Sequence, residues 1–131
     1  MKRILLIDDE AALAEIVKLN LELSGDYSVT LAESGESGLR EIERKAFDLV
    51  ITDFKLPGLS GVDVLRRLKD EHPELPVVLF SVYHDDPSAV PAHARALADG
   101  LIGKPIDHEA MDGLVRRLLS DALDDPAPRS R

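Results

Sequence analysis

The sequence contains no cysteine, no apolar run long enough to cross a membrane, and fewer basic than acidic residues. Without cysteine there is no disulfide framework, which is consistent with a reducing cytoplasm. A membrane span needs about 20 apolar residues, and the run nearest the amino terminus, Ile4–Ile7, is too short even for a secretory signal. A net charge of −9 disfavours sequence-independent binding to nucleic acid. We therefore expect a cytoplasmic protein that binds neither a membrane nor nucleic acid directly.

With 131 residues the chain is long enough for one domain with a substantial core. Hydrophobic residues make up 44% and charged residues 31%, which is typical of globular proteins. We find no internal repeat and no low-complexity segment. We expect an amino-terminal domain over residues 1–122. The composition of residues 123–131 predicts a flexible tail or the start of a linker.

Short apolar runs alternate with helical patterns, which favours a parallel α/β sheet. The predicted strands are Ile4–Ile7, Val29–Leu31, Leu49–Thr52, Val77–Phe80 and Leu101–Ile102. The first, third and fourth runs are nearly continuous, as expected for strands that are covered on both faces. Apolar residues at helical spacing mark four of the intervening helices: Leu13, Ile16 and Val17; Leu39 and Ile42; Leu65 and Leu68; Met111, Leu114, Val115, Leu118 and Leu119.

The segment between the last two predicted strands carries conflicting helix signals. Residues 85–88 resemble a helix start, but Pro91 then falls in the expected helix interior, where proline removes a backbone donor. We therefore expect a short, delayed or kinked helix here. The final helix has clearer start signals in Pro105 and Asp107.

Polar side chains follow four of the predicted strands. Asp8 and Asp9 follow the first strand, Asp53 the third, Ser81 the fourth and Lys104 the fifth. Taken singly, each has an ordinary structural explanation, such as a helix cap or a surface lysine. Because the carboxyl ends of parallel strands face one crevice, we expect all five side chains to meet there.

Such a set suits a divalent metal and a phosphoryl group. Three crowded carboxylates repel one another unless a cation or a proton offsets their charge, and Mg²⁺ (or Mn²⁺) prefers such oxygen ligands. A carboxylate is also a nucleophile that forms an aspartyl phosphate. An ammonium from Lys104 and a hydroxyl from Ser81 would then stabilise the phosphoryl oxygens.

The segments ILLIDDE, DLVITDFKLPGLSGVDVLRRLK, PVVLFS and LIGKP resemble, in order and spacing, the motifs of the response regulator receiver domain family. The resemblance runs from about Lys2 to about Leu119. It implies a flavodoxin-like, doubly wound fold: a five-stranded parallel sheet of order 2-1-3-4-5 with helices on both faces.

The resemblance also implies a role for each candidate residue. The roles are a phosphoacceptor (Asp53), a metal site (Asp8, Asp9, Asp53 and the backbone carbonyl of Lys55), a switch hydroxyl (Ser81) and a phosphate-sensing lysine (Lys104). It further implies a cis bond between Lys104 and Pro105. In the loop after Asp53, Pro57 and Gly58 form a turn pair. Gly61 supplies a backbone conformation that other residues avoid.

The implied function is Mg²⁺-dependent acceptance of a phosphoryl group on Asp53 from a histidine kinase or a phosphotransfer protein. A conformational switch then controls a downstream effector or a fused output domain. Apart from catalysing its own phosphorylation and slow dephosphorylation, such a domain is not an enzyme. None of His72, His84, His93 and His108 has metal-ligand spacing or the position of a phosphodonor.

The sequence departs from the family pattern at four places. Leu101 occupies the position of the switch aromatic, so that Tyr83 either takes over that role or simply covers a loop. Val82 replaces a small residue beside the pocket. The bulky pair of Lys55 and Tyr83 predicts slow hydrolysis of the acyl phosphate. Pro91 alters the helix on the usual output face, which leaves dimerisation open.

These departures leave a second function open. A receiver-like interaction module would retain the fold and bind a partner without switching, as Leu101 and Val82 suggest. A Mg²⁺-dependent phosphohydrolase is disfavoured because such enzymes carry a second acid two residues after the nucleophile, where this chain has Lys55.

Overall fold

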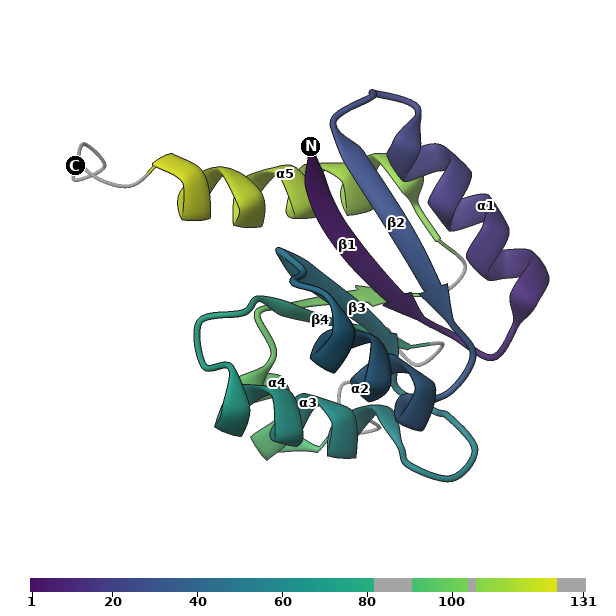
Figure 1. Cartoon of the computed structure of the whole chain (residues 1–131), viewed down its shortest axis with the longest axis vertical. Coiled ribbons are helices and arrows are strands. Elements are labelled where there is room, and N and C mark those ends of the chain that lie inside the picture. The colour runs from purple at the N-terminus through teal and green to yellow at the C-terminus, as the bar shows by residue number, and fades with distance from the viewer. Residues whose placement is uncertain (82–90, 104–105, 125–131) are drawn as a thin grey trace.

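Within the described residues, five strands alternate with five helices (Figure 1). The structure is a computed structural model and describes residues 1–81, 91–103 and 106–124, with side chains as far as residue 120. The elements are β1 (Lys2–Ile7), α1 (Ala11–Glu22), β2 (Tyr27–Ala32), α2 (Gly35–Arg44), β3 (Leu49–Asp53), α3 (Gly61–Glu71), β4 (Val77–Ser81), α4 (Ala92–Leu97), β5 (Gly100–Gly103) and α5 (His108–Asp124). The predicted α/β class is confirmed.

The strands form one parallel sheet in the order β2-β1-β3-β4-β5, as predicted. β1 lies between β2 and β3, and its last residue, Ile7, pairs with Ala32 on one side and Thr52 on the other. All three strands therefore end at nearly the same level. The segments that follow β1 and β3 start side by side at this edge of the sheet.

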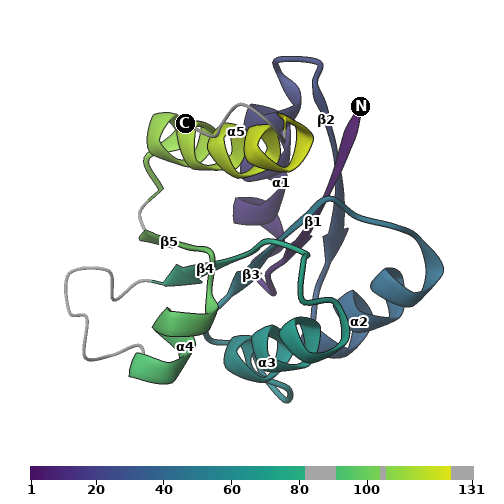
Figure 2. The same cartoon turned by 90° about the vertical axis from the view of Figure 1, so that its left-hand side faces the viewer.

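Helices cover both faces of the sheet. α1 and α5 lie on one face and α2, α3 and α4 on the other (Figures 1 and 2). In β1, Ile4 and Leu6 join the hydrophobic cluster under α1 and α5, and Leu5 and Ile7 join the cluster under α3 and α4. Fully burying such a side chain stabilises the fold by roughly 1.5–3 kcal/mol. A strand that is covered on both faces is apolar at nearly every position, which explains the nearly continuous runs.

The apolar pattern predicted α1, but not the burial of each of its residues. Val17 is fully buried, whereas Ile16 is 48% exposed, because the face of α1 that packs on the sheet is formed by Ala14, Val17 and Leu21. Among the described helices, none combines the length and the apolar content that crossing a bilayer requires.

The helix after β4 is short, as predicted. α4 has six residues and begins directly after Pro91, which occupies its N-cap position with an extended backbone. Proline is tolerated there because the first turn of a helix leaves its N–H groups without intrahelical acceptors. The predicted helix start at residues 85–88 lies outside the described residues. For the last helix, Asp107 caps α5 by accepting hydrogen bonds from the amides of Glu109 and Ala110.

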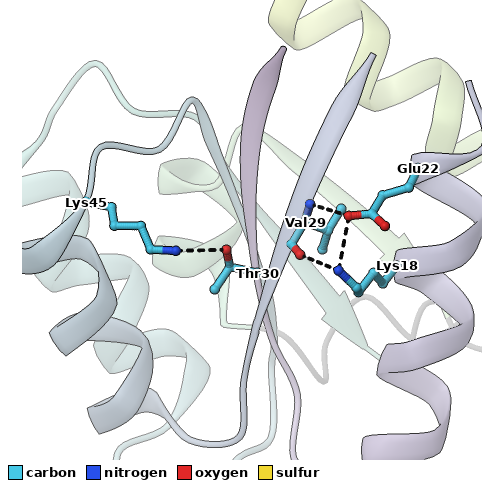
Figure 3. Close-up of polar contacts among 5 residues, drawn as sticks. All are labelled: Lys18, Glu22, Val29, Thr30 and Lys45. Carbon is cyan, nitrogen blue, oxygen red and sulfur yellow. Dashed lines mark hydrogen bonds and ion pairs between the residues drawn. The ribbon is translucent and has the colours of Figure 1, made fainter. Parts of the chain in front are cut away.

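Two side chains of α1, Lys18 and Glu22, form hydrogen bonds with the backbone of the edge strand β2, and we call this arrangement the clamp (Figure 3). The amide of Val29 donates to Glu22 Oε2 at 2.8 Å, and Lys18 Nζ donates to the Val29 carbonyl at 2.9 Å. Lys18 and Glu22 are themselves paired at 3.1 Å. An edge strand presents unpaired backbone groups that invite pairing with another chain, and this clamp occupies one such donor and one such acceptor.

The clamp makes stability depend on pH. The amide of Val29 lowers the pKa of the Glu22 carboxyl below its ordinary value of 4.5, with a smaller contribution from Lys18 and some opposition from burial. Because the pKa of Glu22 is lower in the folded than in the unfolded state, the ionised carboxylate stabilises the fold fully at pH values above the unfolded-state pKa. This stabilisation is lost as the pH falls through the folded-state pKa.

Glu22→Ala should lower the free energy of unfolding at neutral pH by about 1 kcal/mol, the reduced value of a charged hydrogen bond that is partly exposed. The difference should shrink below pH 4.5. Urea unfolding at several pH values measures both effects. Glu15→Ala is the matched control, because Glu15 is exposed on the same helix and its side chain has no hydrogen bond or ion pair among the described residues. A difference that persists unchanged in acid would contradict the linkage.

Candidate functional site

Three carboxylates meet at the carboxyl edge of the sheet. Asp8 and Asp9 follow β1, and Asp53 ends β3. One oxygen from each carboxylate lies within 4.8 Å of the others. Asp8 is 2% and Asp53 7% exposed, whereas Asp9 is exposed. The structure therefore brings together the three acids that the sequence predicted as a cluster.

Asp8 is held by backbone contacts on both sides. Its amide donates to the Ala32 carbonyl of β2 at 3.0 Å, which extends the β1–β2 ladder by one bond. Its Oδ1 atom accepts from the amide of Glu10 at 2.9 Å, which fixes the turn into α1. The carboxylate is thus oriented by the chain that follows it.

Asp53 is fixed by the register of β3 and β4, in which it pairs with Phe80. The next amide, that of Phe54, donates to the Phe80 carbonyl at 2.7 Å. The amide of Lys55 reaches Asp53 Oδ1 at 3.4 Å. The hydroxyl of Thr52, which is fully buried, donates to the Asp53 carbonyl at 3.2 Å. The backbone that carries Asp53 is therefore tied on both sides of this residue.

Ser81 ends β4, the strand beside β3, and is 4% exposed. It pairs with Gly103 at the end of β5. Its element therefore ends at the same edge of the sheet as Asp53. Lys104 and the predicted cis bond to Pro105 lie outside the described residues, as do Val82 and Tyr83.

The loop from Asp53 to α3 needs glycine for two different reasons. Gly58 has a φ of 73°, in the left-handed region, which fits the predicted turn after Pro57. The prediction for Gly61 was wrong, because its φ is not positive. A Cβ atom at Gly61 would collide with the carbonyl oxygen of Asp53. Gly61 is required for close approach, and its amide closes the loop by donating to the Phe54 carbonyl at 3.1 Å.

Two supporting features were missed at the sequence level. Ser60 and Asp63 form a capping box that starts α3 and ends this loop. The spacing of a serine and an acid three residues later is a recognisable helix-start signal, so the sequence contained this information. Thr52 gave no such signal, since a buried threonine is ordinary in a strand.

The donor set fits a hard divalent cation. All three side chains offer carboxylate oxygens, and two of the three are buried. Because buried charges are poorly screened by water, the carboxylates repel one another strongly. Mg²⁺ is bound in proteins by one or two carboxylates and several waters, and the exposure of Asp9 leaves a side of the cluster open to solvent. The acidic cluster is able to hold such a metal.

The family model of the response regulator receiver domain matches residues 4–116. Among curated proteins, the transcriptional regulatory protein GlrR of Escherichia coli (strain K12) is 34% identical over 125 residues, which cover 95% of this chain and 27% of that protein. The uncharacterized transcriptional regulatory protein YkoG of Bacillus subtilis (strain 168) is 35% identical over 88% of this chain and 50% of its own length. The chain thus spans between a quarter and a half of these relatives.

Solved structures agree with this match. A response regulator receiver domain protein from Clostridium thermocellum has a TM-score of 0.83 and 29% identity, covering 93% of this chain and 97% of that one. The response regulator protein TrrA from Thermotoga maritima, solved in complex with Mg(2+)-BeF, has a TM-score of 0.82 and 30% identity. That comparison covers 91% of this chain and 100% of the other.

Gly61→Ala should destabilise the fold by about 2 kcal/mol or more, because the new methyl group forces the Asp53 carbonyl to move. It should also weaken Mg²⁺ binding, measured by amide chemical shifts during a metal titration. Gly113→Ala is the control, because a Cβ atom at this exposed site in α5 meets nothing within 4 Å. There we expect a gain of about 0.5–1 kcal/mol. Equal effects at both sites would refute the close-approach explanation.

Proposed function

This chain belongs to the response regulator receiver domain family, and on that premise we propose that Asp53 accepts a phosphoryl group in a Mg²⁺-dependent reaction. The observation that carries the proposal is the meeting of Asp8, Asp9 and Asp53 within 4.8 Å at the carboxyl edge of a parallel sheet. The family is not an enzyme family in the usual sense, because the phosphoryl group ends on the protein itself.

In the proposed reaction an oxygen of the Asp53 carboxylate attacks the phosphorus atom of the donor. A new O–P bond forms, and the bond from phosphorus to the donor's leaving atom breaks, with its electron pair remaining on the donor. Asp8, Asp9, Asp53 and the Lys55 carbonyl would hold the metal, which would supply positive charge near the phosphoryl oxygens. The Ser81 hydroxyl donates a hydrogen bond to one of these oxygens, and the Lys104 ammonium pairs with another.

The partner in this proposal is a histidine kinase or a phosphotransfer protein that carries the donor phosphohistidine. Residues 1–122 act as the receiver domain and residues 123–131 as a tail or linker. Curated relatives such as GlrR are transcriptional regulators of which this chain covers 27%. This supports an effector domain or a separate effector protein as the target of the switch. We place the signalling in the cytoplasm.

A receiver-like module without switching is the second candidate, and one observation favours it. Leu101, at the position expected for the switch aromatic, is 45% exposed on β5. A leucine lacks the ring and the hydroxyl that would report the phosphoryl group. The phosphoryl group must interact differently with two states in order to shift their populations. Comparing partner binding with and without an acyl-phosphate mimic distinguishes the two candidates.

Incubation with Mg²⁺ and acetyl phosphate should add about 80 Da, one phosphoryl group, to the intact mass. Asp53→Asn should abolish this gain, because an amide is a far weaker nucleophile than a carboxylate. Asp70→Asn is the control, since Asp70 is exposed on α3 and is not one of the three acids of the cluster. A gain that survives Asp53→Asn would identify a different acceptor. If the wild type shows no gain, titration with beryllofluoride tests the pocket, and failure to bind it would refute the proposal.

Asp9→Ala should weaken Mg²⁺ binding by about tenfold or more, as expected when a ligand of a small cation is lost. Isothermal titration calorimetry and amide shifts measure the change. Glu33→Ala removes an exposed carboxylate outside the cluster and should leave the affinity nearly unchanged. If the two variants bind Mg²⁺ alike, Asp9 is not a ligand.

A further inference from the structure

A groove of about 440 Å³ lies beside the acidic site, between the loop after β3, the start of α3 and the start of α4. Both cartoon views place α3 and α4 next to each other (Figures 1 and 2). Phe54, Leu56 and Val62 form its apolar side; Leu56 belongs to the hydrophobic cluster beneath, and Phe54 and Val62 pack against that cluster. The groove is within the size range of binding pockets and has an apolar floor that belongs to the core.

The rim of this groove is basic, in a chain whose net charge is −9. Lys55 and Arg66 contribute cationic side chains, and His93 contributes an imidazole. The acid on the rim, Asp63, is engaged, because it accepts from the amide and the hydroxyl of Ser60 at 3.2 and 3.0 Å. The formal charges of Lys55, Arg66 and Asp63 on this rim sum to a single positive charge, and Arg66 is the cation that the proposal uses.

Arg66 makes its polar contact with another side chain of the rim, and that side chain is not a carboxylate. Its Nη2 atom lies 2.9 Å from His93 Nε2. Arginine is only a donor, so Nε2 is the acceptor of this bond. In the described part of the chain Arg66 has no carboxylate partner, whereas its neighbour Arg67 pairs with Glu71 at 3.6 Å. The planar guanidinium has five N–H donors and is suited to bidentate binding of a carboxylate.

We propose that this groove docks an acidic peptide segment of a partner protein, with a large apolar side chain on Phe54, Leu56 and Val62 and a flanking carboxylate on Arg66. The apolar floor supplies burial, and the basic rim selects acidic against basic segments. This partner contact is additional to phosphoryl acceptance and does not require it, so each is tested separately.

The probe is an acetylated and amidated hexapeptide in which a central Phe-Leu pair is flanked on each side by two acidic residues. It is titrated into the ¹⁵N-labelled whole chain, and amide shifts are followed. We expect saturable shifts concentrated at residues 54–56, 62–66 and 93, which weaken as salt is added. Arg66→Gln should weaken binding by about fivefold, the size of one exposed ion pair. The peptide affinity of Arg66→Lys should lie between those of the wild type and of Arg66→Gln.

Arg67→Gln is the matched control, because it removes the same charge from the adjacent position of α3 outside the groove. It should leave the affinity unchanged. Equal weakening by Arg66→Gln and Arg67→Gln would overturn the proposal in favour of general attraction to a charged surface. Equally tight binding of a peptide with Gln and Asn in place of its acids would overturn the acidic occupant. Shifts confined to another face would overturn the location.

Beryllofluoride is titrated into the same samples to keep the two proposals apart. Normal beryllofluoride binding without peptide docking overturns the groove alone. Peptide docking without beryllofluoride binding overturns phosphoryl acceptance alone and leaves the groove supported.

Discussion

The position of β1 between β2 and β3 is the constraint on which the site depends. Because the three strands are parallel and in register at their ends, the chain that leaves β1 and the last residue of β3 share one edge of the sheet. Asp8, Asp9 and Asp53 meet there although more than 40 residues of sequence separate Asp9 from Asp53. Gathering these carboxylates costs electrostatic free energy, which a bound cation would offset, so the cluster is able to hold a metal.

The end of β3 and the loop that leads to α3 hold the backbone of Asp53 in place. The hydrogen bonds of Thr52 and Phe54 hold the strand end, and the capping box at Ser60 fixes the start of α3. Gly61 then allows the helix to approach the Asp53 carbonyl more closely than any side chain would permit. A functional side chain is held most precisely when its backbone is tied to secondary structure elements, as the backbone of Asp53 is.

The edge of the sheet at β2 and the surface near α4 differ in the contacts they could make with partners. At β2 the backbone is engaged by Lys18 and Glu22, so strand addition is opposed there. Near α4 the packing leaves a groove with a basic rim, and its walls begin directly after Asp53. The short α4, which begins at Pro91, is tied to α3 by the exposed contact between Arg66 and His93. The contacts at Val29 thus oppose a partner strand at β2, and the proposed docking groove lies near α4 instead.

The sequence by itself determined β1, β3 and β4 and the acids of the site, because a strand covered on both faces is apolar at nearly every position and a polar residue at its end is conspicuous. The alternation of these runs with helical patterns indicated the parallel arrangement. The sequence also indicated the short α4 through Pro91. Only the tertiary structure decided that Ile16 faces solvent, that Gly61 serves close approach and that Glu22 closes an edge. Each of these depends on which surfaces meet across the fold, and residue spacing along one element carries no information about the distance to another.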